Sequence, residues 1–153
     1  MEDVDRPLVP RGVRAADRMR DYLDAERIRP ELVLCSSALR TRETLGRVLP
    51  GLGPELIVRI EPSLYSFEAD QLLDRLRELP ANVGSVMLIG HNPAMQELAS
   101  LLAADGDRLD DLRKRFPTAA LAELDLPVGS WDALAAGSAR LERFVVPGEL
   151  GSG

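Results

Sequence analysis

Two short stretches of this 153-residue chain place polar side chains where an apolar segment gives way to a helical one. Segment 34–37, Leu-Cys-Ser-Ser, precedes Arg40, and segment 86–90, Val-Met-Leu-Ile-Gly, precedes His91 and Asn92. The N-terminus of a helix offers unpaired N–H groups and the positive end of its dipole, and arginine adds a forked donor that suits phosphate. The two stretches therefore predict an anion site, with Arg40, His91 and Asn92 as candidate phosphate-binding residues.

Each candidate also has an ordinary structural interpretation. Residues 90–93, Gly-His-Asn-Pro, could form only a turn, in which Pro93 opens the helix and the ring of His91 bonds to backbone. Arg40 could be a surface arginine that pairs with Glu43 or Glu61, an arrangement that contributes little stability. The residues alone leave both interpretations open.

Other catalytic chemistries fit the sequence poorly. A cysteine phosphatase needs an arginine six positions after its thiolate and glycines around it, whereas Arg40 and Arg42 lie on either side of that spacing from Cys35 and the loop has no glycine. A serine hydrolase needs Gly-x-Ser-x-Gly, which is absent. We interpret Cys35 as a small buried apolar residue. One Cys and one His cannot complete a tetrahedral zinc site, so no metal or cofactor is expected.

The composition favours an ordinary folded domain. Hydrophobic residues make up 45% and charged residues 29%, and the formal net charge is −6. An acidic chain is a poor general nucleic-acid binder, because such proteins neutralise phosphates with a basic face. No apolar run approaches the length of a membrane span, and the acidic N-terminus is unlike a signal peptide. We expect a cytoplasmic protein that binds neither nucleic acid nor membrane.

The periodicity of apolar residues and the spacing of Gly and Pro predict alternating helices and strands. Helices are predicted at 11–28, 38–49, 69–79, 94–103 and 108–116, and strands at 32–35, 56–60, 85–90, 119–126 and 139–145. Alternation over the first two thirds indicates right-handed βαβ units and a mostly parallel sheet, to which the last two strands add antiparallel edges. Ligands of such sheets sit at the carboxyl ends of strands, so Arg40 and His91 are expected to converge on one anion.

Several segments together resemble the histidine phosphatase superfamily, and in particular its small phosphohistidine phosphatase (SixA-like) branch. The similar segments are Asp5-Arg6-Pro7-Leu8 with Arg11-Gly12, residues 35–44, Gly90-His91-Asn92-Pro93, and residues 116–120 with Trp131. The resemblance implies a three-layer α/β/α fold of the phosphoglycerate mutase type. It implies one domain over residues 1–150 with a tail at 151–153, in which Arg40 clamps the phosphoryl group and His91 bonds to its oxygens.

The chain departs from that family at one decisive point. Family members begin with a central strand that ends in Arg-His-Gly or a close variant, whose histidine is the nucleophile, and this sequence contains no such motif and only one histidine. Loss of a central strand would leave backbone groups unpaired and apolar helix faces exposed. We therefore expect a domain truncated at its N-terminus, with the strand absent from this chain, rather than a protein that works without it.

The resemblance implies a phosphatase that transfers a phosphoryl group to that histidine and then to water, without a metal. The stretch between Thr44 and Ser85 is too short for a capping subdomain, so the site should be open to a large substrate. A phosphohistidine on a partner protein, such as a phosphotransfer domain or phosphocarrier, fits an open site. Imidazole leaves easily, so no strong acid is required, although Glu61 is a possible one. Alternatives are a broad small-molecule phosphomonoesterase and a catalytically dead phosphate-binding or interaction module.

Overall fold

The computed structural model describes residues 1–127 and 129–150, which cluster into two compact units. Unit 1 comprises Met1–Ser66, Val83–Gly90 and the segment that starts at Pro147, and unit 2 comprises Phe67–Asn82 and His91–Val146. The tail predicted at 151–153 lies outside the described residues. The single domain predicted over 1–150 stays a prediction.

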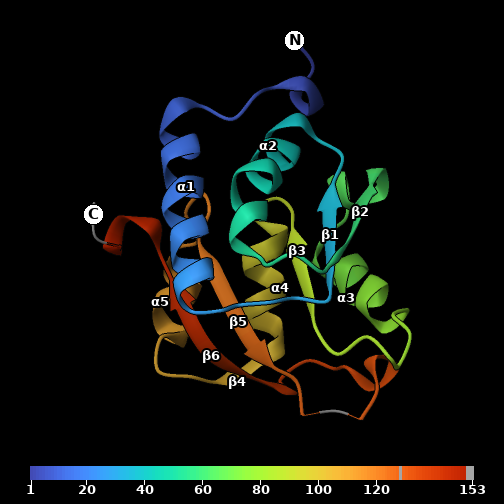
Figure 1. Cartoon of the computed structure of the whole chain (residues 1–153). Helices are drawn as coiled ribbons and strands as arrows, with labels where there is room; N and C mark the ends of the chain where they lie inside the picture. The colour runs from blue at the N-terminus through green and yellow to red at the C-terminus, as the bar shows by residue number, and fades with distance from the viewer. Residues whose placement is uncertain (128, 151–153) are drawn as a thin grey trace. The chain divides into compact units, whose positions relative to one another are not determined.

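Unit 1 is built on a parallel sheet of three strands (Figure 1). Its order is β2-β1-β3, with β1 at Leu32–Ser36, β2 at Ile57–Glu61 and β3 at Val86–Ile89. The strand β1 runs parallel to β2 and pairs with it along its whole length, from Leu32 opposite Ile57 to Ser36 opposite Glu61. The carboxyl ends of β1 and β2 therefore meet at the same edge of the sheet.

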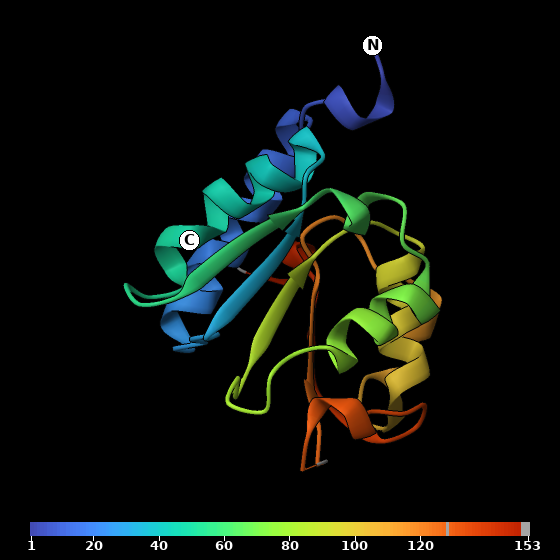
Figure 2. The same cartoon turned by 90° about the vertical axis from the view of Figure 1, so that its right-hand side faces the viewer.

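Two amphipathic helices, α1 at Pro10–Ala25 and α2 at Leu39–Val48, pack side by side and cover one face of this sheet (Figure 2). The helix α1 buries Gly12, Ala16, Met19 and Leu23, which lie at helical spacing along one stripe. The helix α2 buries Thr41, Leu45 and Val48 in the same way. Short 3-10 turns in unit 1 lie at Asp3–Asp5, Leu49–Gly51, Pro62–Tyr65 and Pro147–Glu149.

The first helix ends earlier than its sequence suggested. The prediction extended it to residue 28, just before Arg29-Pro30, but α1 ends at Ala25. Arg27 adopts a left-handed conformation with φ 54°, and the N–H of Ile28 donates to the carbonyl of Leu23. A left-handed residue followed by such a hydrogen bond is a common way to end a helix, so the chain turns before the proline is reached.

Unit 2 holds three helices and a second sheet. The helices are α3 at Ala69–Arg77, α4 at Ala94–Leu102 and α5 at Leu109–Lys114, and the strands are β4 at Ala103–Asp105, β5 at Leu121–Asp125 and β6 at Ala139–Val145. Its core gathers apolar side chains from α4, α5 and β6, with the ring of Phe116 stacked 5.9 Å from that of Phe144 between centroids. A 3-10 turn at Trp131–Ala133 precedes β6.

The second sheet departs from the sequence prediction in two ways. The antiparallel pairing of β5 with β6 is confirmed, but among the described residues these strands form their own sheet of order β4-β6-β5 instead of edges on the parallel sheet. The strand β4 was missed, because three residues, Ala-Ala-Asp, are too few to show an alternating pattern. Among the described helices, none is both long and apolar enough to cross a membrane.

Candidate functional site

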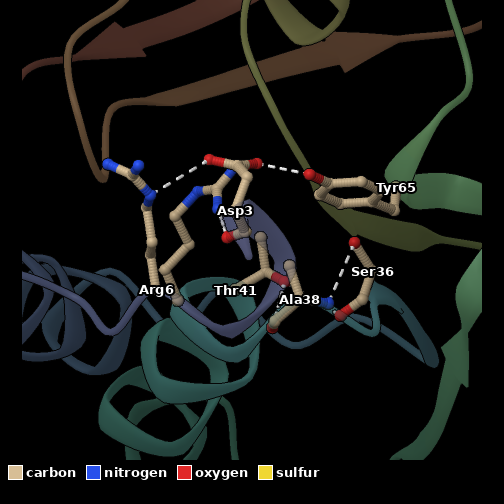
Figure 3. Close-up of polar contacts among 7 residues, drawn as sticks. Asp3, Arg6, Ser36, Ala38, Thr41 and Tyr65 are labelled. Atoms are coloured by element: carbon tan, nitrogen blue, oxygen red, sulfur yellow. Dashed lines mark hydrogen bonds and ion pairs between the residues drawn. The ribbon is translucent and has the colours of Figure 1, made fainter. Parts of the chain in front are cut away.

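The turn between β1 and α2 is held rigidly by its own polar groups. The hydroxyl of Thr41, which is buried, lies 2.9 Å from the carbonyl oxygen of Ser36 and 2.8 Å from that of Ala38, within donating distance of each. The N–H of Ala38 donates to the side-chain oxygen of Ser36 (Figure 3). The sequence Ser-x-x-x-x-Thr thus fixes where α2 begins and, with it, the backbone of Arg40.

The environment of Cys35 is unlike that of a catalytic nucleophile. Its side chain is fully buried in β1, and burial raises the pKa of the thiol to about 11. A catalytic cysteine needs the opposite shift, toward the thiolate. The interpretation of Cys35 as a small buried apolar residue is confirmed.

Arg40 lies in the first turn of α2 and holds a carboxylate. Its Nη2 donates to Oδ2 of Asp3 at 3.2 Å, and its Nη1 donates to the main-chain carbonyl of Asp3 at 2.9 Å. The hydroxyl of Tyr65 donates to the same Oδ2, and Arg6 lies 4.0 Å from the other carboxylate oxygen (Figure 3). Glu43, a partner considered for Arg40, instead accepts the backbone N–H of Leu8 at 2.9 Å. Arg40 therefore pairs with an acidic side chain of the chain itself, Asp3, in a partly exposed ion pair.

The protonation equilibria of this cluster follow from its contacts. The hydrogen bond from Tyr65 is the main cause that lowers the pKa of Asp3 below its ordinary value. Desolvation opposes it, and the hydrogen bond and charge of Arg40 add smaller lowering effects. The hydrogen bond to Asp3 raises the pKa of Tyr65. At neutral pH the cluster therefore comprises a carboxylate, a phenol that keeps its proton, and a guanidinium.

Sequence reasoning missed both Tyr65 and Asp3. Tyr65 ends the 3-10 turn Pro62–Tyr65 that directly follows β2, and β2 ends beside β1. The rule that ligands sit at the carboxyl ends of parallel strands was applied only to the loops after β1 and β3. Applied also to the loop after β2, it would have found Tyr65, whereas nothing in the sequence marks Asp3. Glu61, the possible acid, is the last residue of β2, opposite Ser36.

The other predicted site residues belong to unit 2. His91 is half-buried and follows β3 after Gly90, and its carbonyl accepts the N–H of Met95 at 2.9 Å, so it opens the first turn of α4. The side-chain amide of Asn92 donates to the carbonyl of Phe116. The peptide bond between Asn92 and Pro93 is cis. Because Arg40 belongs to unit 1, its convergence with His91 on one anion stays a prediction.

No family model matches the sequence. Individual proteins and solved structures that are similar to the chain nevertheless identify its family. An uncharacterized protein of Mycobacterium tuberculosis is 32% identical over 149 residues, which cover 95% of this chain and 91% of that protein. A counterpart in Mycobacterium leprae is 34% identical over 148 residues, with 95% and 89% covered.

Solved structures decide which family this is. A protein of Nakamurella multipartitia, assigned as phosphohistidine phosphatase SixA, is 30% identical and superposes with a TM-score of 0.81 over 96% of this chain and 88% of its own. One from Agrobacterium tumefaciens with the same assignment is also 30% identical, with a TM-score of 0.78 over 96% and 87%. The chain belongs to the SixA family. The α/β fold class of the phosphoglycerate mutase type is thereby confirmed, as is the resemblance to the histidine phosphatase superfamily.

SixA-family membership changes how the cluster around Arg40 is interpreted. In a member of a phosphatase family, an arginine that lies at the carboxyl end of a parallel sheet and pairs with a carboxylate is a candidate phosphoryl ligand. The atoms that Arg40 contacts are one carboxylate oxygen and the main-chain carbonyl oxygen of Asp3. Among residues 1–127 and 129–150, no three His, Cys, Asp or Glu side chains are grouped so as to hold a metal ion.

Proposed function

We propose that the chain carries the phosphoryl-binding residues of a phosphohistidine phosphatase, with Arg40 and His91 on the phosphoryl oxygens and Asn92 beside them. The observation that carries the proposal is the hydrogen-bonded ion pair of Arg40 with a carboxylate at the carboxyl end of the parallel sheet, in a chain that belongs to the SixA family. Arginine forms strong charge-assisted hydrogen bonds to carboxylate and phosphate alike, so a group that holds one can hold the other.

The proposed reaction transfers the phosphoryl group in two displacements. The P–N bond to the substrate imidazole breaks as a P–N bond to a histidine nucleophile forms, and water then takes the phosphoryl group from that histidine. Arg40 and His91 offset the negative charge that spreads over the equatorial oxygens in each transition state. Imidazole is a good leaving group, so the reaction depends less on a general acid than hydrolysis of an alkyl phosphate does.

The nucleophile is proposed to come from residues that this sequence does not contain. The 153 residues include one histidine, and it already has a proposed role as a phosphate ligand. In the described part of the chain, β3 pairs only with β1, and all four of its apolar residues are half-buried. A strand that ends in Arg-His and pairs with the open edge of β3 would supply the nucleophile and cover those residues.

The proposed substrate is a phosphohistidine on a partner protein, such as a phosphotransfer domain or a phosphocarrier. The similar solved structures are assigned as phosphohistidine phosphatases, which supports this substrate class. In unit 1, the stretch that follows α2 contains only short turns and β2 before Tyr65, with no inserted subdomain over the cluster. Tyr65, Arg40 and Asp3 are all partly exposed to solvent, which suits a large substrate.

The experiment is to add an N-terminal strand that ends in Arg-His and to assay hydrolysis of a phosphohistidine protein. The 153-residue chain itself should show no turnover, because water alone cannot replace the covalent step. The extended protein should gain hydrolysis, and a matched extension that ends in Arg-Ala should not. Phosphohistidine should be preferred over phosphoserine.

Two outcomes would redirect the proposal. Faster hydrolysis of phosphoserine by the extended protein would indicate a broad small-molecule phosphomonoesterase. An extended protein that folds and binds phosphate but hydrolyses nothing would favour a phosphate-binding module without catalysis, the alternative suggested by the single histidine. Turnover by the 153-residue chain that follows the protein through purification would show that the nucleophile is assigned wrongly.

A further inference from the structure

The Asp3 carboxylate identifies a second hydrogen-bond donor beside Arg40. One oxygen, Oδ2, accepts from both the Arg40 guanidinium and the Tyr65 hydroxyl, so the two donors converge on a single anionic atom (Figure 3). They come from loops that follow adjacent parallel strands, β1 for Arg40 and β2 for Tyr65. Two donors aimed at one point by two rigid strands form a preorganised oxyanion site.

We propose that Tyr65 is a ligand of the phosphoryl group and donates its hydroxyl hydrogen to the same phosphoryl oxygen that Arg40 holds. The inference rests on the proposed function and adds a residue to its site. Phenol keeps its proton at neutral pH, with an ordinary pKa near 10, so Tyr65 donates whether or not the anion is present. In this arrangement Asp3 occupies the phosphoryl position and competes with phosphate for both donors.

The backbone that carries each donor is anchored without the anion. Arg40 sits on α2, whose start is fixed by the buried hydroxyl of Thr41. Tyr65 ends a 3-10 turn that buries Leu64, so the backbone that carries the ring is anchored in the core. Removal of Asp3 should therefore vacate the position between the donors and leave the donors where they are.

The test measures binding of inorganic phosphate to the 153-residue chain by calorimetry. Asp3→Ala should bind phosphate at least about tenfold more tightly than the parent, because an intramolecular competitor at high effective concentration is removed. In the Asp3→Ala background, Tyr65→Phe should weaken binding by about tenfold or more, as expected for loss of a hydrogen bond to a charged group. Tyr22→Phe, the same change at the only other tyrosine, should leave binding unchanged.

A second measurement leaves Tyr65 intact. In Asp3→Ala with Tyr22→Phe, Tyr65 is the sole tyrosine, and its ionisation can be followed by ultraviolet absorbance. Bound phosphate should raise the pKa of the phenol, because a nearby anion that accepts a hydrogen bond from the hydroxyl stabilises the phenol and repels the phenolate. A tyrosine that served only to support the fold would titrate identically with and without phosphate.

The outcomes separate this inference from the proposed function. If Arg40→Ala abolishes phosphate binding in the Asp3→Ala background but Tyr65→Phe binds as tightly as its parent, Tyr65 is no ligand and the Arg40 site stands. If Arg40→Ala leaves binding intact, the phosphate lies elsewhere, and both the proposed site and this inference are overturned. Weakened binding in Tyr65→Phe with Asp3→Ala, at a melting temperature equal to that of Asp3→Ala alone, supports the inference.

Discussion

Strands β1 and β3 are parallel neighbours in one sheet, yet they are buried to different extents. Every residue of β1 is buried, whereas every residue of β3, Val-Met-Leu-Ile, is half-buried. The strand β1 has β2 on one side and β3 on the other, while β3 pairs with β1 alone among the described residues. An apolar strand with one paired edge is typical of a sheet that another strand should extend.

The difference matters for function because each strand positions a candidate ligand. The strand β1 leads into the turn that fixes Arg40, and β3 leads into His91. The first turn is closed by internal hydrogen bonds and is complete within unit 1. We infer that the turn that carries Arg40 is preformed in this chain, whereas β3, which leads toward His91, has an edge that an added strand would pair.

The largest expected effect comes from the two proposed phosphoryl ligands, Arg40 and His91, which should be equally important despite the unequal burial of β1 and β3. In the extended protein, Arg40→Ala should reduce the rate of phosphohistidine hydrolysis by about two to three orders of magnitude, as for loss of one oxyanion donor, with little effect on the fold. His91→Ala should behave similarly.

Arg47→Ala is the matched control for Arg40→Ala, because Arg47 lies at the other end of α2 and faces Asp17 at 3.8 Å. Its rate should equal that of the parent. Turnover numbers and melting temperatures of all three variants, measured side by side, provide the check. An unchanged rate in Arg40→Ala would show that the site is misassigned.

The next effect is on stability, and it compares two leucines that are paired in the parallel ladder of β1 and β3. Leu34 in β1 is fully buried and pairs with Leu88 in β3, which is half-buried. Leu34→Ala should lower the free energy of unfolding by about 2–5 kcal/mol, because it removes buried methyl groups and leaves a cavity. Leu88→Ala should cost only about 1 kcal/mol, because part of its surface is already in water.

Addition of the N-terminal strand should make the two leucines alike. The cost of Leu88→Ala should rise toward that of Leu34→Ala, while the cost of Leu34→Ala stays the same. Urea unfolding of the four variants, with and without the extension, measures both changes. Equal costs in the 153-residue chain would contradict the difference between the strands.

The sequence predicted much of this, and the limits are instructive. The periodicity of apolar residues located all five α-helices and five of the six strands of the described chain, because burial imposes those periods locally. It could not distinguish β1 from β3, since both are short apolar runs and the number of paired edges is a tertiary property. The place of Arg40 in the first turn of a helix that follows a strand was predicted, and its role stays a prediction. The contact of Asp3 with Tyr65 joins residues 62 positions apart and leaves no local pattern.

A smaller expected effect is on the reactivity of the Cys35 thiol, which reports how well β1 is buried. The pKa of Cys35 rises from 9.0 to about 11, so the thiolate population at a given pH falls about a hundredfold, at ten per pKa unit. Iodoacetamide at pH 8 should therefore leave Cys35 unmodified in the folded protein and alkylate it in urea, as mass spectrometry would show. Rapid alkylation of the folded protein would mean that β1 is less protected than its burial indicates.

The smallest expected effect is the pH dependence contributed by the exposed pair Asp3 and Tyr65, which belongs to unit 1 together with Arg40. The pKa of Asp3 is lowered in the folded protein, so its contribution to stability is present above the unfolded pKa, near 3.8, and is lost as the pH falls through the folded value. The pKa of Tyr65 is raised, so its contribution is present below the unfolded pKa, near 10.0, and is lost as the pH rises through the folded value.

Melting temperatures of the parent, Asp3→Asn and Tyr65→Phe across the pH range check both signs. Between the two limits each variant should melt slightly below the parent, by a constant amount. The difference for Asp3→Asn should disappear at acid pH, and that for Tyr65→Phe at alkaline pH. Because the pair is exposed, high salt should shrink both differences. A difference that grew toward acid pH would mean that Asp3 is not the anion that Arg40 and Tyr65 hold.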